Sequence, residues 1–330
     1  MRRIQLREGG GAKESNELIN ELFYKYFAND ILLKSEDAAI LQIDKKIAFT
    51  TDSYTVNPIF FKGGDIGKIA VAGTTNDLAM MGARPLYLSS AFIIEEGFAY
   101  DDLERIVASM AEELSKSGAK IVCGDTKVVP KGSVDKIFIN TTGIGELLVE
   151  GISAHNIQDG DVILVSRDIG AHGATILSAR EEIAIESSLQ SDCASLFGCV
   201  EDILNEKIVP HALRDATRGG LAAVLNEWAL TSNVCIELEE SAIPILDEVR
   251  GICEIFGFEA TDFANEGTFV LSVKQNDAQK SLEILRKYSL NAAIIGRVTE
   301  KKVGKVILNS LYGSSRYLDM PKGELLPRIC

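Results

Sequence analysis

Four aspartates in the first half of the chain lie where the sequence predicts strand ends or tight turns, beside small or hydroxyl residues. They are Asp37, Asp52, Asp77 and Asp125. Magnesium prefers oxygen ligands and keeps several waters, so scattered carboxylates together with phosphate oxygens can hold it. Any single one of these residues is better explained as a turn residue or a helix cap. The four in this pattern favour a magnesium site.

Two Gly-rich segments, residues 63–68 and 215–220, each open a predicted helix. They read Gly63-Gly64-Asp65-Ile66-Gly67-Lys68 and Asp215-Ala216-Thr217-Arg218-Gly219-Gly220. A helix start offers unpaired backbone N–H donors and a dipole that favours anions, so both segments could bind phosphate. The alternative for the first segment is a capped turn, and for the second it is an ordinary Gly-rich turn.

Three further residues could take part in a reaction. Lys127 follows Asp125 at a predicted strand end, where it could serve a phosphate or a carbonyl oxygen. Glu266 precedes an apolar strand and could act as a general base. Cys330 is the last residue of the sequence, in a segment with two prolines that we expect to extend from the body as a mobile tail. A thiol there could be loaded at one protein and unloaded at another. We expect His172, in a Gly-rich setting, to be structural.

Strands and helices alternate along both halves of the chain, which predicts two α/β or α+β domains. The expected helices span residues 15–27, 65–81, 101–117, 172–182, 193–206, 219–231, 244–256 and 276–288. The expected strands span residues 38–43, 47–51, 86–94, 120–123, 134–144, 161–166, 234–238, 268–274, 292–298 and 303–308. Turn residues around 150–161 place the boundary there. We expect domains at 1–150 and 151–310, followed by a flexible C-terminal tail at 311–330.

Composition narrows the class of protein. The chain has 330 residues and a formal net charge of −14 at pH 7, which argues against nucleic acid or anionic lipid as a partner. No apolar run approaches the length of a membrane span, and the beginning of the sequence does not read as a signal peptide. The six cysteines show no metal-like spacing, so we expect reduced thiols in a cytoplasmic protein.

Together these residues resemble the HypE family of hydrogenase maturation proteins, the carbamoyl dehydratases, over nearly the whole chain. Most of the motifs are shared with a wider superfamily that includes aminoimidazole ribonucleotide synthetase, selenophosphate synthetase and thiamine-phosphate kinase, but the final Pro-Arg-Ile-Cys is more specific. The matching motifs are residues 63–68, Asn76-Asp77-Leu78-Ala79-Met80-Met81-Gly82-Ala83-Arg84-Pro85, Gly124-Asp125-Thr126-Lys127-Val128-Val129, residues 215–221, Asn265-Glu266-Gly267, Ile295-Gly296-Arg297-Val298 and Pro327-Arg328-Ile329-Cys330.

The resemblance implies an aminoimidazole ribonucleotide synthetase-like fold with an N-terminal ATP-binding domain and a C-terminal α/β sandwich. It implies a homodimer formed through the N-terminal sheet. Cys330 would receive a carbamoyl group from the carbamoyltransferase HypF and lose water in an ATP-dependent step. The resulting cyano group would pass to iron on a HypC–HypD scaffold. Lys127 and Glu266 would act on the loaded tail, and Mg²⁺ would bind the aspartates named above. The expected ATP-binding residues are Gly64, Asp65, Lys68, Asn76, Asp77, Asp125, Thr217, Arg218 and Gly219.

Three other functions remain open from the sequence. A selenophosphate synthetase normally has a reactive Cys or selenocysteine in its N-terminal Gly-rich loop, whereas residues 1–122 contain no cysteine. A small-molecule kinase of the thiamine-phosphate type would have no use for Cys330. A non-catalytic nucleotide-binding partner would use the tail only for docking. ATP turnover that depends on a carbamoylated Cys330 distinguishes these possibilities.

Overall fold

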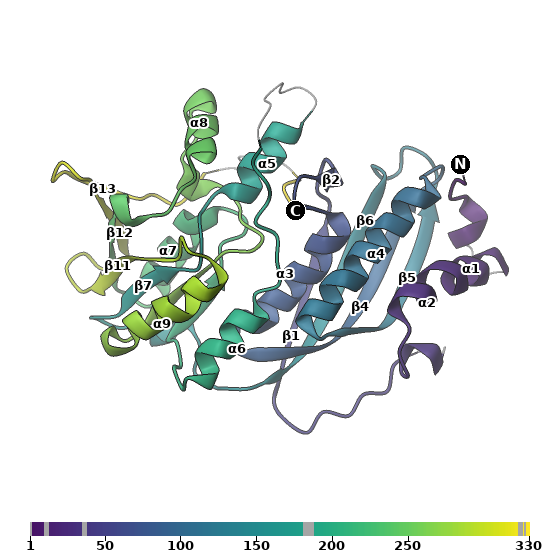
Figure 1. Cartoon of the computed structure of the whole chain (residues 1–330), viewed down its shortest axis with the longest axis horizontal. Coiled ribbons are helices and arrows are strands. Elements are labelled where there is room, and N and C mark those ends of the chain that lie inside the picture. Colours follow the sequence, from purple (N-terminus) through teal and green to yellow (C-terminus); the bar gives the residue numbers. More distant parts are fainter. Residues whose placement is uncertain (1, 10–12, 35–37, 181–187, 323–325, 327) are drawn as a thin grey trace.

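The structure of the chain is a computed structural model that describes residues 2–9, 13–34, 38–180, 188–322, 326 and 328–330. Asp37 therefore lies outside the described residues. Figure 1 shows two α/β halves side by side, with the end of the chain between them. Across the described ranges, none of the helices combines the length and apolar character that crossing a bilayer would require.

A four-stranded sheet forms the first half, in the order β1-β6-β4-β5. The strands are β1 (Ile47–Tyr54), β4 (Ala83–Glu95), β5 (Lys120–Val129) and β6 (Ile137–Leu147). Only the β4–β5 pair is parallel. Helices α3 (Ile66–Met80) and α4 (Tyr100–Ser117) cover one face, as Figure 1 shows. Both confirm predicted helices, and α4 ends at Gly118, whose φ of 76° suits glycine at a helix end.

Strand register fixes which residues share a face of this sheet. Asp52 pairs with Thr141, which lies beside Ser90 of β4, and Ser90 in turn pairs with Gly124 of β5. Because Thr141 donates a hydrogen bond to the Ala70 carbonyl of α3 at 2.9 Å, this row faces the helices. Side chains alternate along a strand, so the neighbouring positions point to the opposite, open face.

The open face of the sheet carries large exposed apolar side chains. Phe49 is 66% exposed, Ile47 49% and Ile93 44%. They lie at both ends of the face, since Phe49 pairs with Ile144 and Ile93 with Phe138 of β6, and exposed apolar side chains spread over one face are consistent with a surface that another molecule covers. Asp125 and Lys127 lie on this same face, because Asp125 follows Gly124 and Lys127 pairs with Ile93.

The segment before β1 departs in part from the sequence prediction. The predicted helix at 15–27 is confirmed as a continuous helical stretch of α1 (Lys13–Leu18), a π-helical turn (Ile19–Phe23) and α2 (Tyr24–Phe27). Its Phe23 ring packs 4.9 Å from the Phe92 ring. The predicted strand at 38–43 is wrong: these residues form no strand, and Ile40 is 88% exposed. A β-prone sequence forms a strand only where a neighbouring strand supplies the ladder.

A seven-stranded sheet forms the second half, in the order β13-β12-β9-β11-β7-β10-β8. Its strands are β7 (Val162–Val165), β8 (Ala212–Asp215), β9 (Cys235–Glu239), β10 (Phe269–Val273), β11 (Ala293–Thr299), β12 (Lys305–Asn309) and β13 (Ser315–Tyr317). The sequence did not predict β8 or β13, since each is very short. The helices are α5 (Ala171–Ala179), α6 (Phe197–Asn205), α7 (Gly220–Thr231), α8 (Asp247–Phe256) and α9 (Gln275–Tyr288).

Both faces of the second sheet are buried, which gives the expected α/β sandwich. Along β7, Ile163 and Val165 pack in a core with Trp228 of α7. The alternate residues Val162 and Leu164 pack in another core with α6 and α9. Strands buried on both faces read as continuous apolar runs, which explains why the Val-Ile-Leu-Val sequence of β7 shows no alternation.

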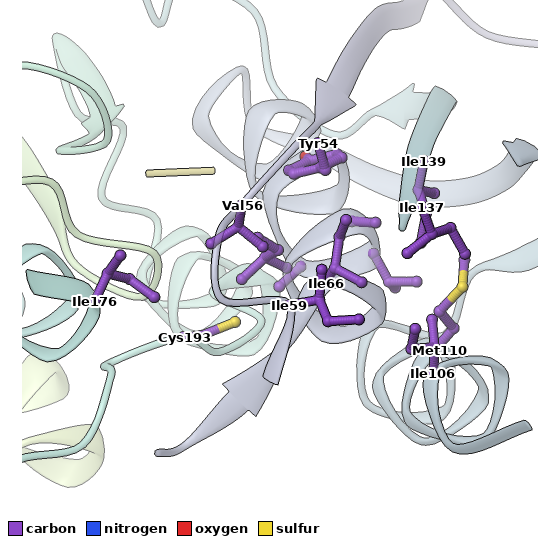
Figure 2. Close-up of a cluster of buried hydrophobic side chains, with 14 of the residues drawn as sticks. Tyr54, Val56, Ile59, Ile66, Ile106, Met110, Ile137, Ile139, Ile176 and Cys193 are labelled. Carbon is purple, nitrogen blue, oxygen red and sulfur yellow. The ribbon is translucent and has the colours of Figure 1, made fainter. Parts of the chain in front are cut away.

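The two halves share a core and direct hydrogen bonds. Figure 2 shows part of a buried cluster that includes Val56 and Ile59 from the first half with Ile176 and Cys193 from the second. At the same junction the side chain of Asn76 donates to the Ala194 carbonyl at 3.0 Å and accepts from the Leu196 amide at 2.8 Å. A buried amide with both ends satisfied fixes the two segments relative to each other.

Candidate functional site

Four carboxylates converge where α3 and β1 meet the second sheet. Asp52 comes from β1, Asp77 from α3, Asp215 from the end of β8, and Glu266 from the loop before β10. Asp77 accepts a hydrogen bond from the Thr50 hydroxyl at 2.6 Å, and Asp52 accepts one from the Tyr54 hydroxyl at 3.3 Å. Asp215 and Glu266 are 9% and 3% exposed. Residues far apart in the sequence thus form one acidic cluster, as predicted for Asp52 and Asp77.

The members of the acidic cluster raise one another's pKa. Burial, with the repulsion of Asp52 added, raises the pKa of Asp77 to about 6. Burial and the charge of Asp77 raise the pKa of Asp215 to about 7. Burial raises the pKa of Glu266 well above its ordinary value, and the charges of Asp215, Asp192 and Asp52 add to the effect. Like charges this close cannot all ionise at little cost, so the cluster takes up protons or a cation.

Asp192 holds Glu266 in place. Its carboxylate accepts from the backbone amides of Glu266 and Gly267, both at 3.0 Å, and from the Thr268 hydroxyl at 2.7 Å. A Cβ on Gly267 would meet the Asp192 carbonyl oxygen at 1.8 Å, so only glycine allows this approach. No sequence motif surrounds Asp192, and no local pattern could have shown a role that depends on amides 74 and 75 residues away.

The final residues of the chain lie against the body rather than away from it, in contrast to the extended tail that the sequence predicted. The Thr55 amide and hydroxyl donate to the Cys330 carbonyl at 2.9 and 3.2 Å, and the Asn57 amide donates to the Arg328 carbonyl at 3.1 Å. The Arg328 guanidinium donates back to the Thr55 carbonyl at 2.8 Å. Ile329 is 6% exposed. Buried apolar contacts and backbone pairing outweigh the effect of the prolines in this conformation.

The end of the chain therefore lies beside the acidic cluster. Thr55, which pairs with Cys330, directly follows Tyr54, whose hydroxyl faces Asp52. The charge of Glu266 also reaches Tyr54, where it adds to burial in raising the tyrosine pKa. Cys330 is half-buried and packs against the core that both halves share. The structure thus brings Cys330 and Glu266 to the same junction.

The first Gly-rich segment is a capped turn. The Asp65 carboxylate accepts from the Gly67 amide at 2.8 Å and the Lys68 amide at 3.0 Å, and the Ile66 amide donates to the Ile59 carbonyl. The Lys68 ammonium donates to the Gly63 carbonyl at 2.9 Å and closes the turn beside Gly64. The N–H groups expected to bind phosphate are thus occupied by the protein itself. The geometry favours a capped turn over a phosphate site for this segment.

Asn76 and the second Gly-rich segment also have structural partners. Both ends of the Asn76 amide are taken by the interdomain bonds, so in this conformation it does not face a nucleotide. Gly219 and Gly220 have φ of 77° and 58°, and a Cβ on Gly220 would meet the Phe263 carbonyl oxygen at 2.5 Å. Thr217 is half-buried and Arg218 is exposed. This segment contributes Asp215 to the acidic cluster. Asp215 belongs to the sequence motif, but it was not predicted as a site residue.

Asp125 and Lys127 lie apart from the acidic cluster within one chain. They form an ion pair with 3.6 Å between the Lys127 Nζ and the Asp125 Oδ1, and both side chains are more than half exposed. Their strand, β5, is at the opposite edge of the sheet from β1, which is about 14 Å away at the usual strand spacing. They also point to the open face, whereas Asp52 points to the helices.

A cavity of about 300 Å³ lies between β5 and the N-terminal helices. Its walls are largely apolar, with Phe23, Phe27 and Phe92 among them, and Asp125, Lys127 and Lys34 also line it. An apolar chamber with a few charged groups is the usual form of a small-molecule site. The two predicted residues of β5 that the acidic cluster does not include border this cavity, and their side chains lie on the opposite face of the sheet from Phe92.

The described residues form no complete cage for a metal ion. Within those ranges, no three His, Cys, Asp or Glu side chains are close enough to hold one by themselves. The acidic cluster nevertheless has the hard oxygen donors that Mg²⁺ requires, and a cation would relieve the repulsion that, after burial, raises the pKa of Asp77 and Asp215. This donor set fits an ion that takes its remaining ligands from water and phosphate.

Comparison with known proteins first defines the class. Residues 35–147 match the family model of the AIR synthase related protein N-terminal domain, and residues 158–309 match that of its C-terminal domain. A thiamine-monophosphate kinase from Stenotrophomonas maltophilia K279a shares the fold, with a TM-score of 0.69 and 20% identity over 91% of this chain and 96% of that one. The fold and the two-domain arrangement are those of the AIR synthase superfamily, as the resemblance implied.

More similar proteins then identify the family. The chain is 47% identical to the carbamoyl dehydratase HypE of Escherichia coli K12 over 100% of both chains, and 44% identical to that of Rhodobacter capsulatus over 99% and 98%. A crystal structure of a hydrogenase maturation protein HypE in complex with ATP superposes with a TM-score of 0.95 at 45% identity, covering 99% of each chain. The chain belongs to the HypE family of carbamoyl dehydratases.

Proposed function

We propose that this protein dehydrates a carbamoyl group carried on the Cys330 sulfur, at the expense of ATP, and leaves a thiocyanate. The observation that carries the proposal is the position of the Cys330 segment, which pairs with Thr55 at the junction that holds Glu266. Family membership supports the same reaction. The cyano group would then serve as a ligand for the iron of a nickel–iron hydrogenase.

The reaction balances with ATP as the acceptor of the oxygen. The carbamoyl oxygen attacks the γ-phosphorus, and ADP leaves. The nitrogen then loses two protons while the carbon–oxygen bond breaks, which releases phosphate and forms the carbon–nitrogen triple bond. Phosphorylation is needed because an amide oxygen is a poor leaving group. The tail makes the step intramolecular, which raises the effective concentration of the substrate.

Glu266 is the candidate base. Its burial and its acidic neighbours raise its pKa, so the ionised carboxylate is a strong proton acceptor once formed. A bound cation would favour that ionised form. Asp192 fixes the backbone of the Glu266 loop, which keeps the carboxylate at the junction where the tail enters. Asp52 and Asp77, with Asp215, would hold Mg²⁺, which supplies charge neutralisation at the phosphates when it is bound.

ATP binding is supported by the cavity beside β5 and by the ATP complex of the relative. Lys127 and Asp125 would face the phosphates, with Lys127 also near the carbamoyl oxygen. Because these residues lie at the far edge of the sheet from the acidic cluster, a complete site needs a second chain. A homodimer that covers Phe49, Ile47 and Ile93 of the open face would hide exposed apolar surface and can bring β5 of one chain to the acidic cluster of the other.

The partners follow from the chemistry and from the relatives. A carbamoyl donor must load Cys330, and a solved complex of HypE with HypF shows a relative with such a partner, at a TM-score of 0.80 and 48% identity over 92% of this chain. We extend this to HypF as the carbamoyl donor and to a HypC–HypD scaffold as the cyanide acceptor, in the cytoplasm. The tail would have to leave the junction for both encounters.

Mass spectrometry of the C-terminal peptide tests the proposal. After incubation with a carbamoyl donor system and ATP, the parental Cys330 should carry a group lighter than carbamoyl by one water. Glu266→Gln keeps the size and loses the base, so it should stall with carbamoylated Cys330; such losses are about 10² to 10⁴ in rate. Cys330→Ala should bind ATP and carry no group. A cyanated tail at the parental rate in Glu266→Gln would show that the base lies elsewhere.

The same experiment separates the alternatives. A kinase of the thiamine-phosphate type would consume ATP equally well in Cys330→Ala. A non-catalytic nucleotide-binding partner would bind ATP without consuming it when Cys330 is loaded. Turnover that requires carbamoylated Cys330 supports the dehydratase.

A further inference from the structure

We propose that His172 is a positioning residue that holds the tail in the junction through the carbonyl immediately before Cys330. The His172 Nε2 lies 2.8 Å from the Ile329 carbonyl oxygen, and its Nδ1 lies 2.8 Å from the Ser191 hydroxyl. The inference deepens the proposed function, because it assigns a residue to the insertion of the loaded tail. The contact itself exists whether or not Cys330 is the carrier.

The direction of each hydrogen bond in this chain of contacts is determined. A carbonyl oxygen can only accept, so the His172 Nε2 must carry the proton and donate to Ile329. In a neutral imidazole the Nδ1 then accepts, and the Ser191 hydroxyl donates to it. The Ser191 oxygen in turn accepts from the Cys193 amide at 3.1 Å. The Ile329 carbonyl thus requires the Nε2–H tautomer of His172, and the Ser191 hydroxyl satisfies that tautomer by donating to Nδ1.

The surroundings keep His172 neutral and in place. It is fully buried, at 0% exposure, and the Phe61 ring meets it edge-on at 5.4 Å between centroids. Burial lowers its pKa, although the Ile329 bond and the charge of Asp192 oppose this. The Ser191 amide donates to the Lys62 carbonyl at 2.9 Å, which ties this contact to the turn beside Phe61. His172 thus joins both halves of the molecule to the tail.

A bond that exists only with the tail inserted shifts the balance between inserted and released tail. Dehydration at the junction requires the inserted tail, whereas loading by a donor protein requires the released one. Loss of the His172 donor should therefore slow dehydration and leave loading equal or faster. General damage to the fold would slow both steps, so the opposite signs identify a positioning role.

Two variants at this position form a matched pair. A glutamine amide nitrogen reaches about as far from the backbone as the His172 Nε2, so His172→Gln can still donate to Ile329. His172→Asn reaches only as far as Nδ1 and cannot. Iodoacetamide labelling of the full-length protein without ATP, read by peptide mass spectrometry, gives the rate at Cys330 relative to that at the fully buried Cys235. This ratio separates release of the tail from unfolding.

We expect the labelling ratio to rise about ten-fold in His172→Asn, because the loss of one hydrogen bond of about 1.4 kcal/mol changes an equilibrium by that factor. In His172→Gln the ratio should stay near the parental value. In single-turnover assays of carbamoylated protein, the Asn variant should dehydrate more slowly than the Gln variant. Because one shift of the equilibrium is divided between the two readouts, this slowing is smaller than ten-fold when the labelling ratio rises about ten-fold. An unchanged or lower labelling ratio in His172→Asn, or an equal rise in both variants, overturns the proposal. If the parental Cys330 is never carbamoylated, the dehydratase function fails, while the labelling ratio still decides the role of His172.

Discussion

An ionised carboxylate in the acidic cluster lowers the stability of the folded protein by an amount that depends on pH. The pKa of Asp215 rises from its ordinary 3.8 to about 7 through burial and the charge of Asp77. The folded state therefore binds this proton more tightly than the unfolded state does between pH 4 and 7. Stability falls as pH rises through that window, and the full cost is present above pH 7. A cation held among these carboxylates would remove it.

Asp215→Asn should therefore stabilise the metal-free protein at pH 8. Three pKa units correspond to at most about 4 kcal/mol, and partial relaxation makes about 1–3 kcal/mol a fair expectation. At pH 4.5 the gain should fall to about a quarter, because only a small part of the interval between the unfolded-state pKa of 3.8 and the folded-state pKa of about 7 has been crossed. Urea unfolding at both pH values measures the difference, with Asp30→Asn, away from the acidic cluster, as the control. Equal effects of Asp215→Asn at the two pH values would refute burial and charge repulsion as the cause.

The sequence predicted individual helices and strands better than it predicted the roles of single residues. The amphipathic α4 and the capped α3 were confirmed because their signals are local: a 3.6-residue period, Asp65 before the first turn and Gly118 after the last. The 38–43 strand failed because a strand needs a neighbour that no local pattern reveals. The roles of Asp192 and of the Ile329 carbonyl could not be found for the same reason. Each depends on a partner brought close only by the tertiary fold.

Helix α3 provides a test of the first Gly-rich segment. Because Asp65 accepts from two amides of this helix, Asp65→Ala should lower the free energy of unfolding by about 1–2 kcal/mol. Asp65→Asn keeps an acceptor and should lose much less. Calorimetry should give the same ATP affinity for Asp65→Asn and the parental protein, because the cap keeps the turn closed in both. A large loss of affinity in Asp65→Asn, with stability intact, would return this segment to the phosphate site.

At the scale of the whole molecule, two groups of candidate site residues lie far apart. Lys127 and Asp125 lie on the open face at β5, and the acidic cluster lies on the helix side at β1. Sheet strands do not exchange places, so no local movement unites the two groups within one chain. If two chains pair through the open face, each complete site takes β5 residues from one and Asp52, Asp77 and Glu266 from the other. Mutations in the two groups should then complement each other.

Mixtures of inactive variants test this arrangement. Lys127→Ala and Glu266→Gln should each be inactive alone. After equal mixing and subunit exchange, half of the dimers are mixed, and each of these has one site without a lesion, so roughly a quarter of the parental dehydration rate should return. Asp52→Asn mixed with Glu266→Gln is the matched control, because both residues lie in the acidic cluster and every site would keep one lesion. No recovery in the first mixture despite confirmed exchange would place the complete site within a single chain. Recovery in the control would show that Asp52 and Glu266 do not belong to the same site.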